Sequence, residues 1–249
     1  MFNYVIKAFF DFMLSTILLI IFSPIIILFS FFIWKQDFGN PFYVAPRMGK
    51  NGNQFKMVKF RSMIVGADKN KVDSTSSDDK RLTKLGTFIR RYKIDEIPNL
   101  FNILKGEMSF VGPRPNVKRE TEMYSNQENF LLTMKPGITD LSSIVFSDEG
   151  DILKDSDDPD LTYNQLIRPW KSRLGLYYVR NNNLIFDIKI LLLTFISLLN
   201  KTYALNQIEK LLNKNINKID KELLNIVKRD TPLYPYPPPG MDEIVKFRL

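Results

Sequence analysis

One uncharged stretch dominates the hydrophobic pattern of the chain, between Asp11 and Lys35. It reads FMLSTILLIIFSPIIILFSFFIW (12–34), and its 23 residues suffice for a straight helix to cross a hydrocarbon core of roughly 30 Å. Ser23-Pro24 stands at its midpoint. Proline removes one backbone hydrogen bond and kinks a helix, and a serine hydroxyl can satisfy the freed carbonyl. The stretch predicts a membrane helix, either spanning with a kink or re-entrant with its break at Ser23-Pro24.

Residues 82–92 have the spacing of an amphipathic helix. Its apolar positions are Leu82, Leu85, Phe88, Ile89 and Tyr92, and Lys84, Arg90, Arg91 and Lys93 fall on other faces. Because proline is tolerated in the first turn of a helix, Pro98 predicts a second helix that starts near Asp95 and stops at Gly106. Asp95 and Glu96 then lie at a helix N-terminus, which favours ionised carboxylates. By itself the pair fits helix capping or a catalytic site beside arginines.

Residues 39–63 are predicted to form turns and short strands. If 56–61 is extended, Met57, Lys59 and Arg61 share one face, and Lys56, Val58 and Phe60 share the other. Lys59 and Arg61 would then form either a phosphate-binding surface or a solvated strand edge. Residues 66–80 lack apolar periodicity, which predicts a mobile surface loop.

Three C-terminal segments remain open between alternatives. In 170–199, Trp170, Tyr177 and Tyr178 with basic neighbours fit a helix in the membrane interface or a buried core helix. After 201, apolar residues recur at three- and four-residue spacing, which predicts a coiled-coil or partner helix, or a Lys-rich helix on anionic lipid. These residues are Leu205, Ile208, Leu212, Ile216, Ile219, Leu223 and Ile226. The proline-rich 232–240 is an extended spacer or a strap across the surface.

Composition narrows the chemistry. The 249 residues carry a net charge of +8, which is compatible with nucleic acid, anionic lipid or phosphorylated substrates. No common nucleic-acid motif occurs, so lipid and phosphate partners are favoured and no nucleic acid is expected. The chain has no cysteine and no histidine. Disulfides, thiolate or imidazole catalysis and zinc-thiolate sites are therefore excluded, whereas a carboxylate–Mg²⁺ site stays possible.

Three ordered motifs carry a resemblance to a known family. They are DEIPNLFNILKGEMSFVGPRP (95–115), KFRSM (59–63) and KPGIT (135–139). Together they resemble the bacterial sugar transferases, the monotopic enzymes that load a sugar phosphate onto a polyprenyl phosphate. The resemblance covers roughly residues 1–200. It implies a mostly helical α+β fold: a re-entrant helix broken at Ser23-Pro24, interfacial amphipathic helices and a small cytoplasmic catalytic domain.

The resemblance also implies a mechanism. A UDP-sugar would donate its sugar 1-phosphate to polyprenyl (undecaprenyl) phosphate, giving the polyprenyl-diphosphate sugar and UMP. Asp95 would be the nucleophile that becomes phosphorylated, and Glu96 would hold Mg²⁺. Phosphate oxygens would be bound by Lys59, Arg61, Arg90 and Arg114. Arg114 lies between Pro113 and Pro115, which restrict the backbone and present its guanidinium.

The chain departs from the family pattern at 136–150, where PGIT is kept but the usual continuation, including an arginine, is absent. The identity of the sugar is therefore not predicted. We expect a membrane helix (1–35), a catalytic domain (36–200) and a helical C-terminal extension (201–249) that raises the prospect of a homodimer. Basic residues after the membrane helix predict a catalytic domain on the cytoplasmic side of the bacterial inner membrane. The alternative function is a membrane-anchored scaffold without catalysis.

Overall fold

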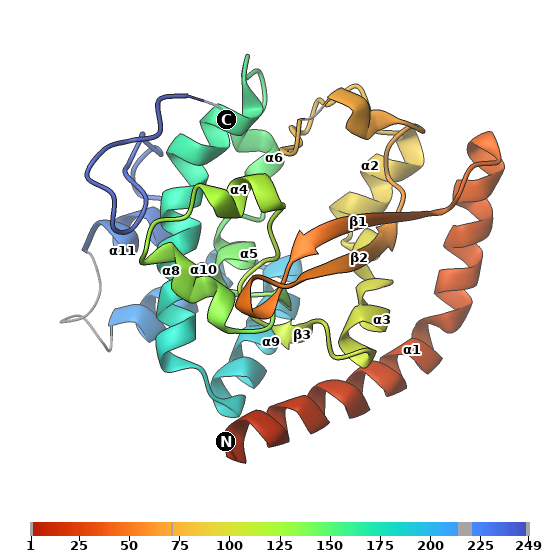
Figure 1. Ribbon diagram of the computed structural model, residues 1–249, viewed down its shortest axis with the longest axis horizontal. Coiled ribbons are helices and arrows are strands. Elements are labelled where there is room, and N and C mark those ends of the chain that lie inside the picture. Colours follow the sequence, from red (N-terminus) through yellow and green to blue (C-terminus); the bar gives the residue numbers. More distant parts are fainter. Residues whose placement is uncertain (1, 71, 214–220, 248–249) are drawn as a thin grey trace.

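The computed structural model describes residues 2–70, 72–213 and 221–247, and helices dominate it (Figure 1). The α-helices are α1 (Phe2–Asp37), α2 (Lys84–Arg91), α3 (Asn99–Leu104), α4 (Lys118–Glu122), α5 (Leu141–Val145), α6 (Glu149–Ile152), α7 (Pro159–Thr162), α8 (Arg168–Asn181), α9 (Leu184–Leu199), α10 (Lys201–Asn213) and α11 (Lys221–Lys228). Tighter 3₁₀ turns occupy Lys50–Gly52, Ala67–Asn70, Ile94–Glu96 (η3) and Glu128–Thr133, and Tyr163–Ile167 is a π-helical turn. The mostly helical α+β class is confirmed.

Two small sheets accompany the helices. Strands β1 (Phe42–Met48) and β2 (Gln54–Phe60) form an antiparallel hairpin. Strands β3 (Ser109–Val111) and β4 (Gly137–Thr139) pair in parallel. Because parallel strands end at the same edge, the residues that follow β3 and β4 lie next to each other. The second sheet therefore brings the Gly-Pro-Arg-Pro turn beside the segment that begins at Asp140.

The long helix α1 is unbroken through Pro24 and changes direction about midway along its length (Figure 1). The hydroxyl of Ser23 donates a hydrogen bond to the carbonyl of Ile20 at 2.8 Å. That carbonyl would bond the amide of residue 24 in a regular helix, and proline has no amide hydrogen to give. The predicted kink and the predicted role of Ser23 are confirmed. In the described part of the chain, α1 is the one helix long and apolar enough to cross a membrane.

One side of α1 packs against the rest of the protein along most of its length. This side carries the buried residues Ser15, Ile26 and Ile33. The apolar residues on the other side of α1 are exposed. Near its start, Lys7 forms an ion pair with the buried carboxylate of Asp187 on α9. The ammonium group of Lys7 is therefore held inside the protein by a buried partner and does not extend to the lipid headgroups.

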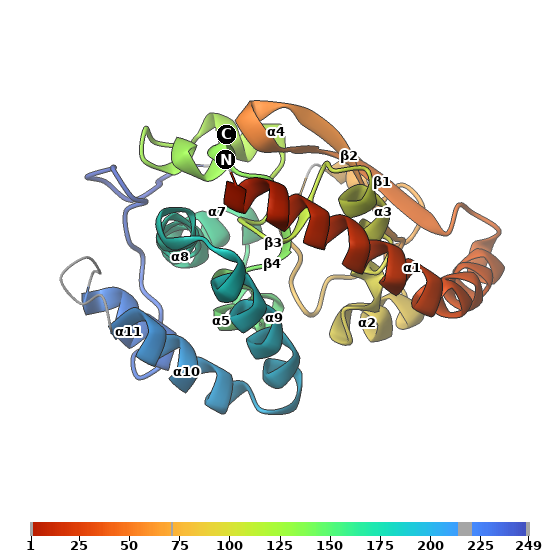
Figure 2. The same cartoon turned by 90° about the horizontal axis from the view of Figure 1, so that it is seen from below.

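Helix α8 lies at the centre of the hydrophobic core. Trp170 and Tyr178 are fully buried, so the core alternative is correct for α8 and the interfacial one is wrong. Helix α9 differs, because one of its faces is exposed and apolar. This face carries Ile185, Ile188, Leu192, Phe195, Leu198 and Leu199. Viewed from below, α9 lies beside the N-terminal part of α1 (Figure 2).

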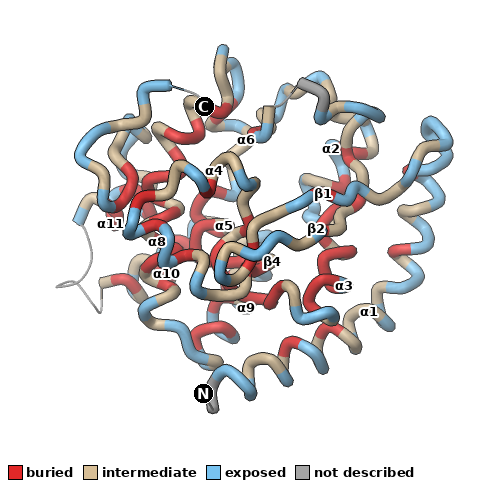
Figure 3. Tube along the Cα trace, in the orientation of Figure 1, coloured by how far each residue is buried: buried red, intermediate tan, exposed pale blue. Residues whose placement is uncertain are grey.

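The C-terminal helices α10 and α11 fold back onto this core. Leu205, Ile208, Leu212, Leu223 and Ile226 are all buried in it (Figure 3). Ile216 and Ile219 lie outside the described residues. The described positions that predicted a partner helix thus pack within their own chain, so they offer no apolar face to a second copy.

The proline-rich segment crosses the surface of α8 as a strap. Tyr236 stacks on Trp170 with ring centroids 4.5 Å apart, and the carbonyl of Pro237 accepts a hydrogen bond from Arg173 at 3.0 Å. The carbonyl of Pro239 accepts one from the hydroxyl of Ser125. Of the two alternatives for 232–240, the strap is confirmed.

Candidate active site

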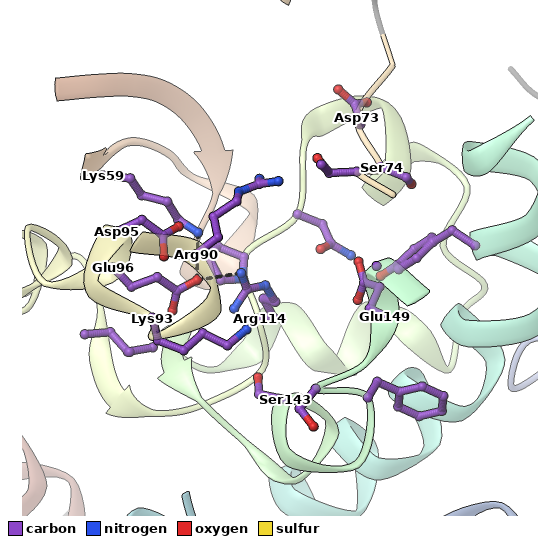
Figure 4. A pocket seen from close by; sticks show the side chains of 18 of the residues that line it. Lys59, Asp73, Ser74, Arg90, Lys93, Asp95, Glu96, Arg114, Ser143 and Glu149 are labelled. Carbon is purple, nitrogen blue, oxygen red and sulfur yellow. Dashed lines mark hydrogen bonds and ion pairs between the residues drawn. The ribbon is translucent and has the colours of Figure 1, made fainter. Parts of the chain in front are cut away.

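A cavity of about 660 Å³ lies between α2–α3 on one side and α5, α6 and α8 on the other (Figure 4). One wall carries the predicted residues and is called the motif wall: Lys59, Arg90, Lys93, Asp95, Glu96, Asn99 and Arg114. The opposite wall is called the distal wall: Asp73, Ser74, Thr75, Ser76, Ser77, Glu120, Ser143, Phe146, Ser147, Asp148, Glu149, Gly150, Asp151 and Lys171. The two walls face each other across a space large enough for a nucleotide sugar.

The carboxylate pair sits in a tight turn rather than inside a helix. Helix α2 ends at Arg91, and Lys93 adopts a left-handed conformation with φ of 57°. Asp95 and Glu96 then occupy η3, and Pro98 precedes the first residue of α3. The predicted helix start at Asp95 is thus wrong by four residues, whereas the predicted stop at Gly106, with φ of +76°, is confirmed. The sharp turn directs both carboxylates to the cavity.

Glu96 is the centre of a buried charge cluster. Its Oε1 accepts hydrogen bonds from the Lys59 ammonium at 2.8 Å and from the Arg114 guanidinium at 2.7 Å (Figure 4). Burial disfavours the charged carboxylate, but Arg114 and Lys59 outweigh it and hold the pKa of Glu96 well below its usual range. Glu96 in turn raises the pKa of Arg114. The cluster therefore keeps Glu96 ionised and Arg114 charged, whereas burial lowers the pKa of Lys59.

Asp95 experiences the opposite balance. Burial, and then the negative charge of Glu96, raise the pKa of Asp95 above its usual value. Lys59, Arg90 and Lys93 oppose this rise through their positive charges. Asp95 is 6% exposed but lines the cavity, so a ligand there can reach it. Two adjacent carboxylates with separated pKa values are a common arrangement in catalytic sites.

Close packing of backbone positions Arg114. A Cβ on Gly112 would lie 2.4 Å from the carbonyl of Lys135, and one on Gly137 would lie 2.2 Å from the amide nitrogen of Gly112. Only glycine allows the two segments to approach this closely. The preceding carbonyl, that of Val111, accepts hydrogen bonds from Lys7 at 3.0 Å and from the hydroxyl of Tyr178 at 3.1 Å. The turn that presents Arg114 is therefore anchored to α1 and α8.

Arg61 is the predicted ligand-binding residue that the structure does not bring to the cavity. Its guanidinium pairs with Asp37 at 2.5 and 2.6 Å and also donates to the carbonyl of Ile33, at the end of α1. The predicted alternation of β2 holds up to its last residue, because Met57 and Lys59 both line the cavity while Phe60 is buried on the other face, but Arg61 follows the end of the strand. Phe60 packs beneath α1 and α2 in a separate small core, which turns the end of β2 away from the cavity.

The distal wall contains residues that the sequence did not single out. Residues 73–77, predicted to be a mobile loop, are tied down: the amide of Ser74 donates to Asp160 at 2.7 Å and that of Ser77 to the carbonyl of Gly150 at 2.8 Å. Glu149 pairs with Lys171. Ser74 to Ser77 form a hydroxyl-rich run in the sequence, and this run is the one local signal that points to a polar ligand.

Two further cavity residues stand out for their environment. Burial, and then the charges of Asp73, Glu149 and Asp160, raise the pKa of Glu120 to about 7. Asn99 follows Glu96 by three residues, and its buried side-chain oxygen has no hydrogen-bond partner among the described residues. An unsatisfied acceptor at a cavity is matched by a ligand that donates a hydrogen bond.

The acidic residues fit Mg²⁺ only in one mode. Within the described chain, no group of three or more acidic side chains forms a metal cage. Mg²⁺ in phosphoryl-transfer sites is bound by one or two carboxylates, with substrate phosphates and water completing six ligands. Both ion pairs of Glu96 fall on Oε1. A single glutamate beside a phosphate-sized cationic site therefore fits a metal that arrives with a diphosphate.

A family model described as bacterial sugar transferase matches residues 2–201. The chain belongs to the bacterial sugar transferase family. This confirms the resemblance read from the three motifs, and the matched region contains the whole motif wall. The match stops at the first residue of α10, so the C-terminal extension lies almost wholly beyond it.

Named relatives share the family but differ in length. An uncharacterized sugar transferase of Haemophilus influenzae is 35% identical over 80% of this chain, which corresponds to 42% of that protein. A putative undecaprenyl-phosphate N-acetylgalactosaminyl 1-phosphate transferase of Bacillus subtilis is 43% identical over 49% of this chain and 68% of its own length. The UDP-glucose:undecaprenyl-phosphate glucose-1-phosphate transferase of Klebsiella pneumoniae is 33% identical over 80% of this chain and 42% of its own length. The chain thus spans less than half of two of these relatives.

Proposed function

We propose that this protein transfers a sugar 1-phosphate from a UDP-sugar to polyprenyl phosphate through a phosphorylated Asp95. The observation that carries the proposal is the motif wall: a carboxylate pair with pKa values shifted in opposite directions, held among Lys59 and Arg114 at a cavity. Relatives of this chain are named for undecaprenyl-phosphate sugar phosphotransfer, which supports the same reaction class here.

The reaction proceeds in two displacements. A carboxylate oxygen of Asp95 attacks the β-phosphorus of the donor, the bond from this phosphorus to the bridging oxygen breaks, and UMP leaves with that oxygen. The sugar 1-phosphate is then an acyl phosphate on Asp95. A phosphate oxygen of the polyprenyl phosphate attacks the same phosphorus, releasing the Asp95 carboxylate and the polyprenyl-diphosphate sugar. Two anionic substrates thus never need to occupy the site together.

The surrounding charges suit the phosphorus centre. Arg114 and Lys59 neutralise phosphate oxygens, and Arg90 adds a third cation at the rim of the cavity. Mg²⁺ held by Glu96 would neutralise charge that develops on the diphosphate during UMP departure. Because Glu96 stays ionised while Asp95 is the more basic carboxylate, Asp95 is the better nucleophile of the two.

The packing of α1 supports a re-entrant position in the bacterial inner membrane. An isolated spanning helix would separate from the domain. Here residues in both halves of α1 are buried: Ser15 before the bend, and Ile26 and Ile33 after it. The bend at Ser23-Pro24 and the exposed apolar faces of α1 and α9 are suited to insertion into one leaflet. The catalytic cavity then faces the cytoplasm, which supplies UDP-sugars. The scaffold alternative gains no support from α10 and α11, since the core contains their apolar residues Leu205, Ile208, Leu212, Leu223 and Ile226.

Release of UMP from UDP-glucose, UDP-galactose and UDP-N-acetylgalactosamine tests the proposal. The protein is reconstituted in nanodiscs with undecaprenyl phosphate and Mg²⁺. Asp95→Asn should lower turnover by at least about 10³-fold, because an amide cannot form the acyl phosphate. Membrane association, measured by flotation with liposomes, should be unchanged. Asp242→Asn, which changes the same groups on the exposed tail, is the matched control. Undiminished UMP release by Asp95→Asn would contradict the mechanism.

A further inference from the structure

The distal wall depends on a turn that has no cation of its own. Residues 146–151 line the cavity, yet residues 136–153 contain no lysine or arginine. This turn carries three acidic side chains, Asp148, Glu149 and Asp151. These three carboxylates repel one another, and they also repel an anionic substrate. Nearby cations from other segments must compensate this negative charge.

Lys171 compensates Glu149, and the C-terminal extension supplies the cations for Asp148. The Arg229 guanidinium donates through Nη2 to the carbonyl of Val145 at 2.8 Å and to Oδ1 of Asp148 at 2.9 Å. It also lies over the ring of Phe146, 4.8 Å from the ring centre. The ammonium of Lys201 reaches the same Asp148 oxygen at 3.1 Å. One arginine therefore binds both ends of the 145–148 turn and covers the aromatic side chain between them.

The position of Arg229 is itself firmly held. The residues just before it, Ile226 and Val227, are buried in the main core. Arg229 follows the last residue of α11 and has a φ of 62°. This left-handed conformation is costly for a non-glycine residue and persists where the surroundings fix it. The guanidinium is thus carried to the turn by a packed helix rather than by a free chain end.

The turn passes this restraint to groups inside the cavity. The carbonyl of Gly150 accepts the amide of Ser77, which joins the turn to the 73–77 segment of the distal wall. Glu149 pairs with Lys171 and contributes to the electrostatic environment of Arg114. A shift of the turn would therefore change the distance between the charges of Glu149 and Arg114. It would also break the hydrogen bond between the amide of Ser77 and the carbonyl of Gly150. The turn before α6 belongs to the distal wall, whereas α1 packs against α3, which contributes Asn99 to the motif wall.

We propose that Arg229 is a positioning residue through which the C-terminal extension holds the distal wall in the shape that binds the nucleotide-sugar donor. The inference rests on the proposed function, since it concerns the affinity of the same cavity. Arg229 does not touch the reacting atoms. Its loss should weaken donor binding while the chemical step on Asp95 continues at its normal rate. The lipid substrate should be unaffected, because the turn belongs to the distal wall, whereas the membrane helix α1 packs against α3 on the motif-wall side.

Steady-state kinetics in nanodiscs tests this, with the UDP-sugar that the wild-type protein turns over fastest. Arg229→Met should raise the donor KM about tenfold, with kcat and the KM for undecaprenyl phosphate within about twofold of wild type. Arg229→Lys should recover part of the affinity, because one ammonium can replace the charge but cannot match the planar guanidinium over Phe146. Lys228→Met is the matched control: it removes the neighbouring cation, the last residue of α11, which pairs with Glu209 instead of the turn.

Each outcome decides the inference. A donor KM within twofold of wild type in Arg229→Met overturns it, and so does an equal rise in Lys228→Met. A parallel rise in both KM values also overturns it, because it indicates general loosening. If Arg229→Met does not fold, Asp148→Ala removes the ion pair between Arg229 and the turn, and an unchanged donor KM there is equally contrary. Wild-type protein that releases no UMP from any UDP-sugar overturns the proposed function as well, which separates the two failures.

Discussion

The two walls of the cavity are built in opposite ways. The motif wall comes from one continuous stretch, 90–114, plus Lys59, and its Val111 carbonyl is held by Lys7 of the membrane helix. The distal wall is assembled from four separate segments, and its Val145 carbonyl is held by Arg229 of the C-terminal extension. In each wall a cation from a distant helix fixes the carbonyl that precedes the functional turn.

The difference suggests a division of roles, with phosphoryl transfer at the motif wall and binding of the donor at the distal wall. The motif wall concentrates cations around two carboxylates, which is what transfer of a phosphoryl group requires. The distal wall is rich in hydroxyl and carboxylate groups, which suit hydrogen bonding to a sugar or a ribose. The family model covers the first wall completely but not the extension that supports the second. Substitutions in the motif wall should thus impair catalysis itself, and those in the distal wall should alter binding of the donor.

Replacement of Glu96 is the largest test of this division. Glu96→Gln should lower kcat roughly 10²–10³-fold, because Lys59 and Arg114 lose the negative charge they share and the proposed Mg²⁺ would lose its carboxylate. The dependence of the residual rate on Mg²⁺ concentration should be lost. The control is Glu122→Gln, which alters an exposed pair with Lys118. A mutant that keeps normal kcat and normal Mg²⁺ dependence would remove Glu96 from the mechanism.

Removal of Lys7 should be the next largest change, and it concerns stability. Lys7→Met leaves the buried Asp187 without its cation and the Val111 carbonyl with one donor fewer. We expect a loss of ~3 kcal/mol, or a fall in Tm of roughly 6–12 °C in nanodiscs. Lys246→Met, which removes an exposed pair with Glu243, should leave Tm unchanged. Equal Tm values for the two mutants would show that α1 is not docked through Lys7.

The next smaller effect is expected for Arg114→Lys, and Arg61→Lys serves as its comparison. Arg114→Lys keeps the charge but loses the planar donor pair, so kcat/KM for the donor should fall about tenfold to thirtyfold. Arg61→Lys should change kcat/KM by less than about twofold, because Arg61 binds Asp37 outside the cavity. An equal loss in both mutants would restore Arg61 as a substrate-binding residue and contradict the placement described here.

The smallest effect is a pH dependence. Because burial and Glu96 raise the pKa of Asp95, its nucleophilic carboxylate is lost at a higher pH than for an exposed aspartate. The first half-reaction, UMP release with donor alone, should therefore lose kcat/KM as pH falls through this raised pKa. Glu120, with a pKa of about 7, is the competing group. In Glu120→Gln the acid limb should persist. If the fall in kcat/KM at low pH disappears in Glu120→Gln, the titrating group is Glu120 of the distal wall and not Asp95.

The sequence predicted the motif wall better than the rest because its signal is local. Pro98, Gly106 and the Gly-Pro-Arg-Pro turn restrict the backbone directly, so Asp95, Glu96 and Arg114 could be placed together. Even there, the left-handed Lys93 shifted the helix start, which no spacing rule indicates. The distal wall escaped prediction because its parts meet only through long-range contacts such as Ser77 with Gly150.

Amphipathic patterns predicted helices correctly but could not identify what covers their apolar faces. The apolar spacing after 201 correctly indicated helices, but it cannot say whether another chain or the same chain covers the apolar face. Trp170 and Tyr178 posed the same problem, since aromatic residues with basic neighbours occur both in membrane interfaces and in cores. Arg61 shows a third limit: it follows the last residue of β2, so alternation along the strand could not place its side chain, which pairs with Asp37 outside the cavity.

Mass spectrometry of the protein quenched during the donor half-reaction tests the central claim most directly. Wild-type protein incubated with a UDP-sugar and Mg²⁺, without polyprenyl phosphate, should release about one UMP per chain in a burst and gain the mass of one sugar phosphate. Peptide mapping should place that group on Asp95, and addition of undecaprenyl phosphate should remove it. UMP release that requires the lipid substrate, with no adduct on Asp95, would contradict a two-step mechanism in favour of direct transfer.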